Sequence, residues 1–259
     1  MHRILVTSCK GGVGKSTVSA GIAAALASRG KKVLLIDFDL GNRSLDLMLG
    51  LEDAVLYDVC DLAAGRIGAD SAILIHPKYP NLAFVAAPFR YEGDLTAENF
   101  GRALSLLEET GDYDFVLIDT SGGAHESVAL SAPFCETALI VSSQNPTSIR
   151  AAEKSGLILD EFGVGEQRLV INGFDMQKEN LGKRAGVIEM IDRTRTPLCG
   201  IIPLDPRLTL LSEQGQTALD GGKTNARTAF ENIAGRLCGE NIPLLRGFCG
   251  IRRKQLLFS

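Results

Sequence analysis

The chain has 259 residues with a formal net charge of −4 at pH 7, and hydrophobic residues make up 45% of it. This balance is typical of a folded globular enzyme and excludes a disordered or fibrous chain. The acidic surplus disfavours a surface built for nucleic acid, which is therefore not an expected partner. The apolar run at the amino terminus is too short for a signal peptide, and no stretch approaches the roughly 20 apolar residues of a membrane span. Six scattered cysteines contain no C-x-x-C pair, so we expect reduced thiols in a cytoplasmic protein.

Short apolar runs alternate with longer helical patterns along the chain. The strand candidates are residues 4–6, 33–36, 82–85, 115–118, 138–141, 169–171 and 199–202. The helix candidates are residues 16–29, 97–109, 146–161, 183–191, 207–214 and 224–239. Continuous apolar strands that alternate with helices predict an α/β fold with a doubly wound, mostly parallel sheet covered by helices on both faces. We expect one domain over residues 1–242 and a tail over 243–259.

A glycine-rich loop follows the first strand. Residues 9–17 read C-K-G-G-V-G-K-S-T and end as a phosphate-binding loop does, between a strand and a helix. Glycines let backbone N–H groups turn around the β-phosphate, and the next helix adds the positive end of its dipole. Lys15 would reach the β- and γ-phosphates, Ser16 would bind Mg²⁺, and Thr17 would donate toward the α-phosphate. A turn that only joins strand to helix is the weaker alternative. The residues expected to bind ATP are Gly11, Gly12, Val13, Gly14, Lys15, Ser16 and Thr17.

A second lysine, Lys10, precedes these glycines. The run K-G-G-V-G-K-S-T resembles the deviant Walker A motif of the MinD/ParA family of P-loop ATPases. In that family the extra lysine reaches the nucleotide of the partner subunit, and many members lack the first Walker glycine, where this chain has Cys9. The resemblance, which runs from residue 1 to about 240, implies an ATP-bound homodimer. It also implies that Lys10, Lys15 and Asp39 are catalytic.

Two later strands end in acidic residues. The run D-F-D-L-G-N-R-S-L-D-L, which begins at Asp37, resembles the first switch of the MinD branch more than the D-x-D-P-Q-G-N-A of the ParA branch. By this resemblance Asp39 would orient the attacking water through the Mg²⁺ shell, and Asp37 would anchor the strand end. Asp119 suits a Walker B position, and Gly122 suits the mobile glycine of the second switch. The expected metal ligands are thus Ser16, Asp39 and Asp119, and the expected switch residues are Asp37, Asp39, Asp119 and Gly122.

Two further positions resemble the base-binding residues of the family. Asn172 ends a strand where family members hydrogen-bond the adenine, and Pro203 lies in an I-P-L-D run that matches the segment closing over the base. Both residue types are also ordinary turn formers. Asp46 is interpreted as a carboxylate on a helix face. The three histidines have no metal-ligand spacing and are assigned no chemistry.

The chain after Pro243 reads LLRGFCGIRRKQLLFS, which is basic and rich in large apolar residues. We expect this amphipathic tail to fold on an anionic membrane surface, although a docked helix or a frayed terminus is the alternative. The residues expected to contact the membrane are Leu244, Leu245, Phe248, Ile251, Arg252, Arg253, Lys254 and Phe258.

Three functions fit these features. The first is a MinD-like regulator of septum placement, cytoplasmic and peripherally bound to the inner face of the cell membrane, with a division inhibitor or activator protein as partner. The second is a ParA-like partitioning ATPase, which would need a basic DNA-binding surface. The available cations are interleaved with acids and are interpreted as a solvated face: Lys178, Lys183, Arg184, Arg193 and Arg195. The third is a MinD-like regulator of flagellar number. Arg43 in the first switch favours the division branch over this third function.

Overall fold

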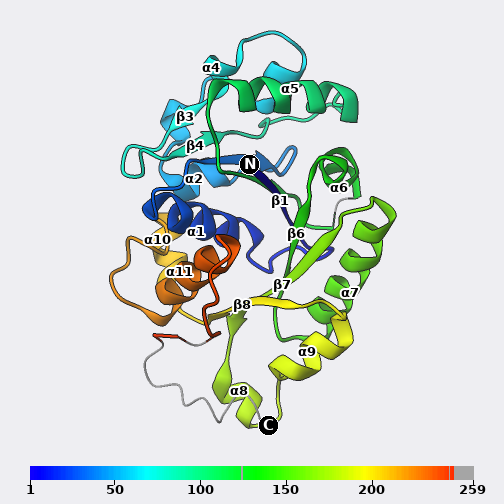
Figure 1. The fold of residues 1–259 in the computed structure, drawn as a ribbon, viewed down its shortest axis with the longest axis vertical. Helices are drawn as coiled ribbons and strands as arrows, with labels where there is room; N and C mark the ends of the chain where they lie inside the picture. Colours follow the sequence, from blue (N-terminus) through cyan, green and yellow to red (C-terminus); the bar gives the residue numbers. More distant parts are fainter. Residues whose placement is uncertain (124, 245, 248–259) are drawn as a thin grey trace.

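The computed structural model describes residues 1–123, 125–244 and 246–247. Within these residues eight strands form one sheet in the order β3-β4-β2-β5-β1-β6-β7-β8 (Figure 1). The strands are β1 (His2–Thr7), β2 (Val33–Phe38), β3 (Leu74–Ile75), β4 (Leu82–Val85), β5 (Phe115–Thr120), β6 (Thr137–Ser142), β7 (Glu166–Phe174) and β8 (Leu198–Pro203). All neighbours pair in parallel except β3, which runs antiparallel to β4. The predicted α/β class with a mostly parallel sheet is confirmed.

Helices cover both faces of the sheet (Figure 1). The longer helices are α1 (Lys15–Ser28), α5 (Ala97–Thr110), α7 (Pro146–Glu161), α9 (Val187–Thr194) and α11 (Asn225–Leu237). The shorter ones are α2 (Leu45–Leu49), α3 (Val59–Ala63), α4 (Ala69–Ala72), α6 (His125–Ser131), α8 (Met176–Asn180), α10 (Arg207–Glu213) and the 3₁₀ turns η1 (Glu52–Ala54) and η2 (Ala132–Phe134). None of the helices in the described part of the chain has the length and apolar character to cross a bilayer.

The sheet separates two hydrophobic cores. One lies between the sheet and helices α1, α2 and α11, and the other lies under α3, α5, α7 and α9. Strands β2, β4, β5 and β6 are buried at every residue, which explains their unbroken apolar sequences. Helix α1 is similarly apolar because α11 covers it. A methyl group on Gly21 of α1 would lie 2.4 Å from the Phe230 ring of α11, so the glycine allows this close packing.

The elements that differ from the prediction are short. Strand β3 has two residues, and helices α2, α3, α4, α6 and α8 have four to seven, too few for a periodic pattern to appear. The helix expected over 183–191 begins later, at Val187, because Gly186 provides its N-cap. The first helix ends where expected, with Gly30 in the left-handed region at φ 80°.

Side chains of α11 hold the chain that follows it. Arg236 donates hydrogen bonds to the carbonyl oxygens of Ile242 and Pro243 at 2.9 and 3.0 Å, and to that of Cys199 in β8 at 2.9 Å. Asn232 Nδ2 donates to the Arg246 carbonyl at 2.8 Å. The first residues of the expected tail are therefore fixed against the domain.

Candidate nucleotide-binding site

The glycine-rich loop follows β1, a strand in the middle of the sheet. Strand β1 lies between β5 and β6: the chain runs from β1 to β2 on one side of it and later from β5 to β6 on the other side. Ligands of open α/β sheets bind at such a switch point, beyond the carboxyl ends of the strands. Strand β5 pairs with β1, and β2 pairs with the other side of β5, where the register places Asp37 directly opposite Asp119. The predicted phosphate loop and both predicted switches therefore share one edge.

The loop has the backbone geometry that phosphate binding requires. Gly12 and Gly14 have φ of 73° and 87°, values that glycine adopts without strain. Gly14 is the N-cap of α1 and provides no side-chain cap, so the first N–H groups of the helix remain available to an anion. Lys15, the first residue of α1, is buried. The structure thus places a lysine and a positive helix end beside the acidic strand ends.

Asp119 combines a raised pKa with a carboxylate oxygen that has no hydrogen-bond partner in the described structure. Its carboxyl is fully buried, and one oxygen accepts a hydrogen bond from Ser19 Oγ at 2.7 Å, while Oδ2 has no partner in the described structure. Burial raises the pKa of Asp119 to about 6, although the hydroxyls of Ser19 and Ser16 and the charge of Lys15 act in the opposite direction. A buried oxygen without a partner beside the Ser16 hydroxyl fits a bound cation.

Asp37 organises the segment that is predicted to be the first switch. Its carboxylate accepts hydrogen bonds from the backbone N–H groups of Asp39, Ser44 and Leu45 at 3.0, 3.2 and 3.0 Å. Burial and the nearby charge of Asp119 raise the pKa of Asp37 to about 7, and these three donors oppose the shift. The side chain therefore ties the loop after β2 to the start of α2, which refines its expected role as a strand-end anchor.

Asp39 is the accessible acid of the site. It is half-buried, and burial raises the pKa of its carboxyl, while a hydrogen bond from Asn42 and the charge of Lys15 lower it. Asn42 Nδ2 donates to Asp39 Oδ2 at 3.3 Å. A half-buried carboxylate beside the buried lysine is well placed to contact water or a hydrated cation.

Asp46 lies on helix α2, as interpreted, and forms an ion pair there. It is 1% exposed, and its oxygen is 2.6 Å from Arg43 Nε. The Arg43 guanidinium also lies over the Phe89 ring, 5.9 Å from the centroid. This ion pair between a partly exposed arginine and a buried acid fixes the end of the predicted first switch to α2.

Gly122 of the second switch touches the phosphate loop. A methyl group in place of its hydrogen would lie 2.6 Å from Gly11 Cα and 3.1 Å from Lys15 Nζ. Backbone contact at this distance leaves no room for a side chain. A movement of the segment that contains Gly122 would therefore displace the phosphate loop, as expected for a switch.

The two predicted base-binding residues lie on neighbouring strands. Phe174 pairs with Pro203, and Asn172 precedes this point on β7. Asn172 Nδ2 donates to the Val13 carbonyl of the phosphate loop at 2.8 Å, and a methyl on Gly14 would lie 2.3 Å from the same nitrogen. The amide is therefore brought to the loop, while its role toward a base stays a prediction.

Lys10 is the one predicted catalytic side chain that turns away from this cluster. Its Nζ donates to Asn145 Oδ1 at 3.0 Å and to Thr147 Oγ1 at 2.7 Å, both at the start of α7. Of the two predicted lysines, Lys15 therefore lies close to the acids of this cluster, and Lys10 is bound to the start of α7.

Several supporting residues were not predicted. Ser19 lies one turn after Ser16 on α1 and donates to Asp119. It is a polar residue in a helix that is otherwise apolar from Val18 to Ala27, and this isolated hydroxyl could have indicated a buried polar partner. Asn42 has no comparable signal. Asn145, before Pro146, indicates a helix cap, but its contact with Lys10 depends on tertiary structure.

The described residues hold no group of three or more His, Cys, Asp or Glu side chains with the geometry of a metal site. Magnesium does not require one, because it is commonly held by one or two carboxylates together with phosphates and water. Ser16, Asp39 and Asp119 therefore fit the expected cation.

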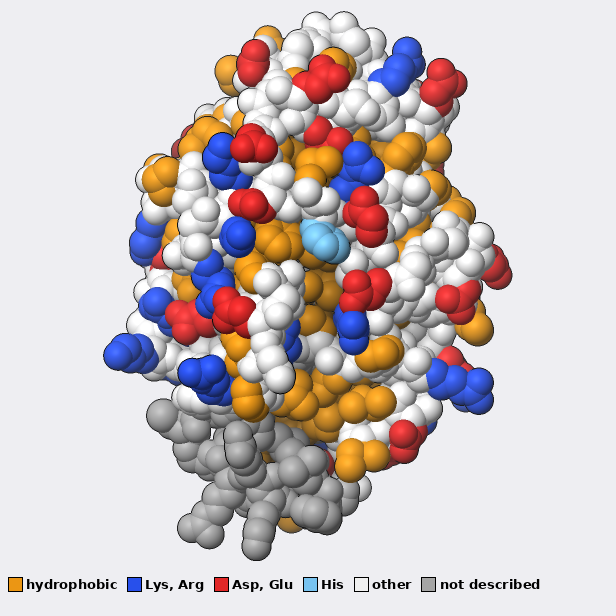
Figure 2. All heavy atoms as spheres, in the orientation of Figure 1, with side chains coloured by type: hydrophobic (Ala, Val, Ile, Leu, Met, Phe, Trp, Pro, Cys, Tyr) orange, Lys and Arg blue, Asp and Glu red, His pale blue; other side chains and the backbone are white. Residues whose placement is uncertain are grey.

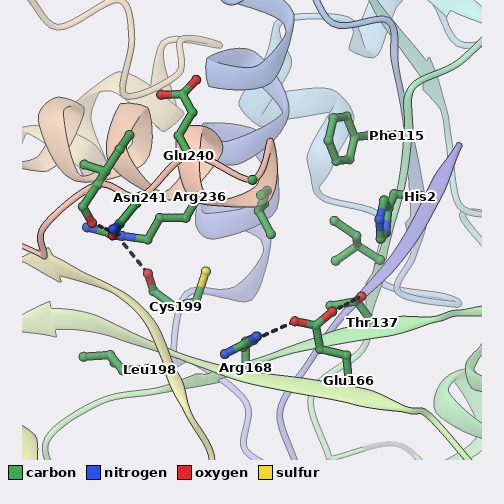
Figure 3. A pocket seen from close by; sticks show the side chains of 14 residues that line it. His2, Phe115, Thr137, Glu166, Arg168, Leu198, Cys199, Arg236, Glu240 and Asn241 are labelled. Carbon is green, nitrogen blue, oxygen red and sulfur yellow. Dashed lines mark hydrogen bonds and ion pairs between the residues drawn. The ribbon is translucent and has the colours of Figure 1, made fainter.

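A cavity of about 490 Å³ lies at the opposite end of the sheet (Figure 3). It is lined by the first residues of β1, β5, β6, β7 and β8 and by the end of α11. Two contacts form between residues that line it: the hydrogen bond from Arg236 to the Cys199 carbonyl and the ion pair of Arg168 with Glu166. The first contact joins β8 to α11, the second lies within β7, and both are far from the phosphate loop.

The cations considered for DNA binding are partly neutralised. Lys178 pairs with Asp175 at 3.1 Å and Arg193 with Glu189 at 3.3 Å. On the face seen in Figure 2, acidic and basic side chains are interspersed. These observations agree with a solvated face. Of the expected membrane-contacting residues, Leu244 is exposed, and Leu245, Phe248, Ile251, Arg252, Arg253, Lys254 and Phe258 lie outside the described residues.

Comparisons with known proteins agree with this geometry. The profile of the CobQ/CobB/MinD/ParA nucleotide binding domain matches residues 4–218. The septum site-determining protein MinD of Synechocystis is 35% identical over 248 residues, which cover 95% of this chain and 92% of that protein. The MinC:MinD cell division protein complex of Aquifex aeolicus contains a similar chain, with a TM-score of 0.89, 32% identity and coverage of 95% and 99%. MinD from Pyrococcus horikoshii complexed with Mg-ADP gives a TM-score of 0.77 at 26% identity, with coverage of 91% and 95%.

Proposed function

Because the chain belongs to the CobQ/CobB/MinD/ParA family of nucleotide-binding proteins, we propose that it is a dimerising ATPase that regulates placement of the division septum. The observation that carries this proposal is the unequal placement of two lysines in one loop. Lys15 is buried and its charge acts on the carboxyls of Asp39 and Asp119, whereas Lys10 Nζ binds Asn145 and Thr147. A second nucleotide-bearing copy gives the outer lysine a phosphate to bind.

The residues of one subunit divide the work of ATP hydrolysis. Backbone N–H groups of the loop and the start of α1 bind the phosphates, and Lys15 balances their charge. Ser16, Asp119 and Asp39 would hold Mg²⁺, which supplies positive charge to the phosphoryl oxygens when bound. Asp39 is the acid exposed enough to orient water. Asn172 and Pro203 would bind the adenine, as in the family.

A test of dimerisation compares Lys10→Ala with Lys32→Ala. Lys32 pairs with Asp112 on the surface and serves as a matched lysine control. With ATP, wild type and Lys32→Ala should sediment as dimers, and Lys10→Ala should remain monomeric and hydrolyse ATP poorly. It should retain nucleotide affinity, because Lys15 is intact. Normal dimerisation and turnover of Lys10→Ala would refute the proposal.

Membrane attachment through the tail is the second part of the proposal. Its basic residues would each gain roughly 1 kcal/mol near anionic lipid, and its apolar residues would add to this. One copy binds weakly, but pairing two tails makes the second attachment intramolecular and can raise avidity by about 100-fold. ATP hydrolysis would then release the protein into the cytoplasm.

The tail can be removed without disturbing the domain if the chain ends at Gly247. This truncation keeps the carbonyls that Arg236 and Asn232 bind. Full-length protein with ATP should sediment with anionic liposomes, whereas full-length protein with ADP and the truncated protein with ATP should not. Equal sedimentation of the truncated protein would place membrane contact elsewhere.

The division role is tested in the cell. A fluorescent fusion should lie at the membrane near poles or septum, with the division inhibitor or activator as its partner. A nucleoid distribution would instead support a partitioning ATPase, and a flagellar-base position would support regulation of flagellar number.

A further inference from the structure

The contact that holds Lys10 joins two segments far apart in the sequence. Lys10 Nζ donates to Asn145 Oδ1 and Thr147 Oγ1, and the neighbouring Cys9 backbone N–H donates to Ser155 Oγ at 2.9 Å. The loop is thus bound to the first and third turns of α7. Among the described residues, no acidic side chain forms an ion pair with Lys10, so its partners are neutral.

We propose that Asn145 and Thr147 are positioning residues that hold Lys10 within its own chain until a second subunit arrives. This inference rests on the proposed function, in which Lys10 acts on the partner's nucleotide. The lysine cannot bind α7 and a phosphate of another subunit at once. Breaking the contact with α7 is therefore a step of dimerisation, and its strength sets the protein concentration at which dimers form.

The acceptors are fixed before Lys10 binds. Asn145 is the N-cap of α7, and its Oδ1 accepts from the Ser148 backbone N–H at 2.9 Å. Its Nδ2 donates to Ser143 Oγ at 2.8 Å, which in turn donates to Ser148 Oγ at 2.9 Å. Because this network orients the amide from both ends, Lys10 meets a preformed pair of oxygens.

The same network makes the contact weak. Asn145 Oδ1 also accepts from Thr147 Oγ1 at 2.7 Å, so three donors share one amide oxygen with two lone pairs. A cation at a helix N-terminus, moreover, faces the positive end of the helix dipole. Lys10 is therefore held by hydrogen bonds but opposed by the local field, which suits a contact that must open.

Two substitutions should shift dimerisation in opposite directions. Thr147→Val keeps the size of the side chain and removes one acceptor, so the concentration for half-maximal dimerisation should fall about threefold to tenfold. Asn145→Asp keeps the helix cap and adds a negative charge, so that concentration should rise about threefold or more. Thr147→Ser retains the hydroxyl and should behave as wild type.

The assay is analytical ultracentrifugation of the full chain with a non-hydrolysable ATP analogue and Mg²⁺. Affinity of the monomer for the analogue, measured at low protein concentration, should stay unchanged in all three variants. Shifts in the same direction, or equal behaviour of Thr147→Val and Thr147→Ser, would overturn this inference alone. Normal dimerisation of Lys10→Ala would overturn the proposed function as well.

Discussion

Replacing Asp119 with Asn should stabilise the nucleotide-free protein near neutral pH and should have little effect near pH 4. The carboxyl is fully buried, and burial raises its pKa from 3.8 to about 6. An amide keeps the oxygen that accepts from Ser19 but has no charge to bury. The substitution therefore removes the ionisation cost while preserving the neighbouring hydrogen bond.

The pH dependence has a definite sign. Below about pH 4 the carboxyl is protonated in both folded and unfolded chains, so it contributes no difference. Between about 4 and 6 only the folded protein retains the proton, and stability falls as the pH rises. Above about 6 the full cost is present. A rise of the pKa from 3.8 to about 6 corresponds to about 3 kcal/mol, or roughly 6–12 °C in Tm for a chain of this size.

Thermal unfolding with EDTA and no nucleotide, followed from about pH 4 to pH 8, tests this prediction. Asp112→Asn is the matched control, because the Asp112 side chain is 99% exposed. The gain for Asp119→Asn should appear across the window from 4 to 6, and Mg-ATP should stabilise this variant less than wild type. A difference between variant and wild type that is constant with pH would refute the reasoning.

Three further substitutions test separate parts of the site. Gly122→Ala should lower turnover strongly because its methyl would lie 2.6 Å from Gly11 Cα, whereas Gly165→Ala, with open space around it, should remain active in the same ATPase assay. Lys15→Ala should lose nucleotide binding by titration calorimetry, while Asp39→Ala should bind Mg-ATP, hydrolyse it slowly and accumulate as a dimer; a shared binding defect would contradict these roles. Asn172→Ala should weaken ATP binding by about tenfold with unchanged turnover at saturation, and unchanged affinity would remove its base-binding role.

The sequence was sufficient for the features that depend on local pattern. The unbroken apolar runs predicted the parallel sheet because every residue of β2 and β5 is buried on both faces. The loop, Asp37 and Asp119 were recognised from their motifs at strand ends, and the parallel strands bring them to one edge. The short strand β3 was missed because two residues form no period.

Contacts between distant segments were beyond sequence reasoning. Lys10 was recognised from its motif, but nothing local indicates that Asn145 and Thr147 hold it, since 135 and 137 positions separate them. Asp46 was interpreted as a carboxylate on a helix face, but only the fold shows that it is buried and paired with Arg43. Such roles depend on packing and not on residue type.

A final prediction concerns the contact between helix α2, which follows the first switch, and the segment after α10. A methyl on Gly215 would lie 2.7 Å from Gly50 Cα, while one on Gly222 would meet no atom within 4 Å, although φ is 65° and 74° at the two positions. Alanine at either site costs roughly 1–2 kcal/mol of backbone strain, and overpacking adds about 1–3 kcal/mol at Gly215 alone.

Urea unfolding of Gly215→Ala and Gly222→Ala isolates this contact, because the strain is common to both. Since Asp37 binds the backbone N–H of Leu45 at the start of α2, displacement of the helix should also slow ATP turnover in Gly215→Ala more than in Gly222→Ala. Equal stability and equal turnover in the two variants would show that the first switch does not depend on this packing.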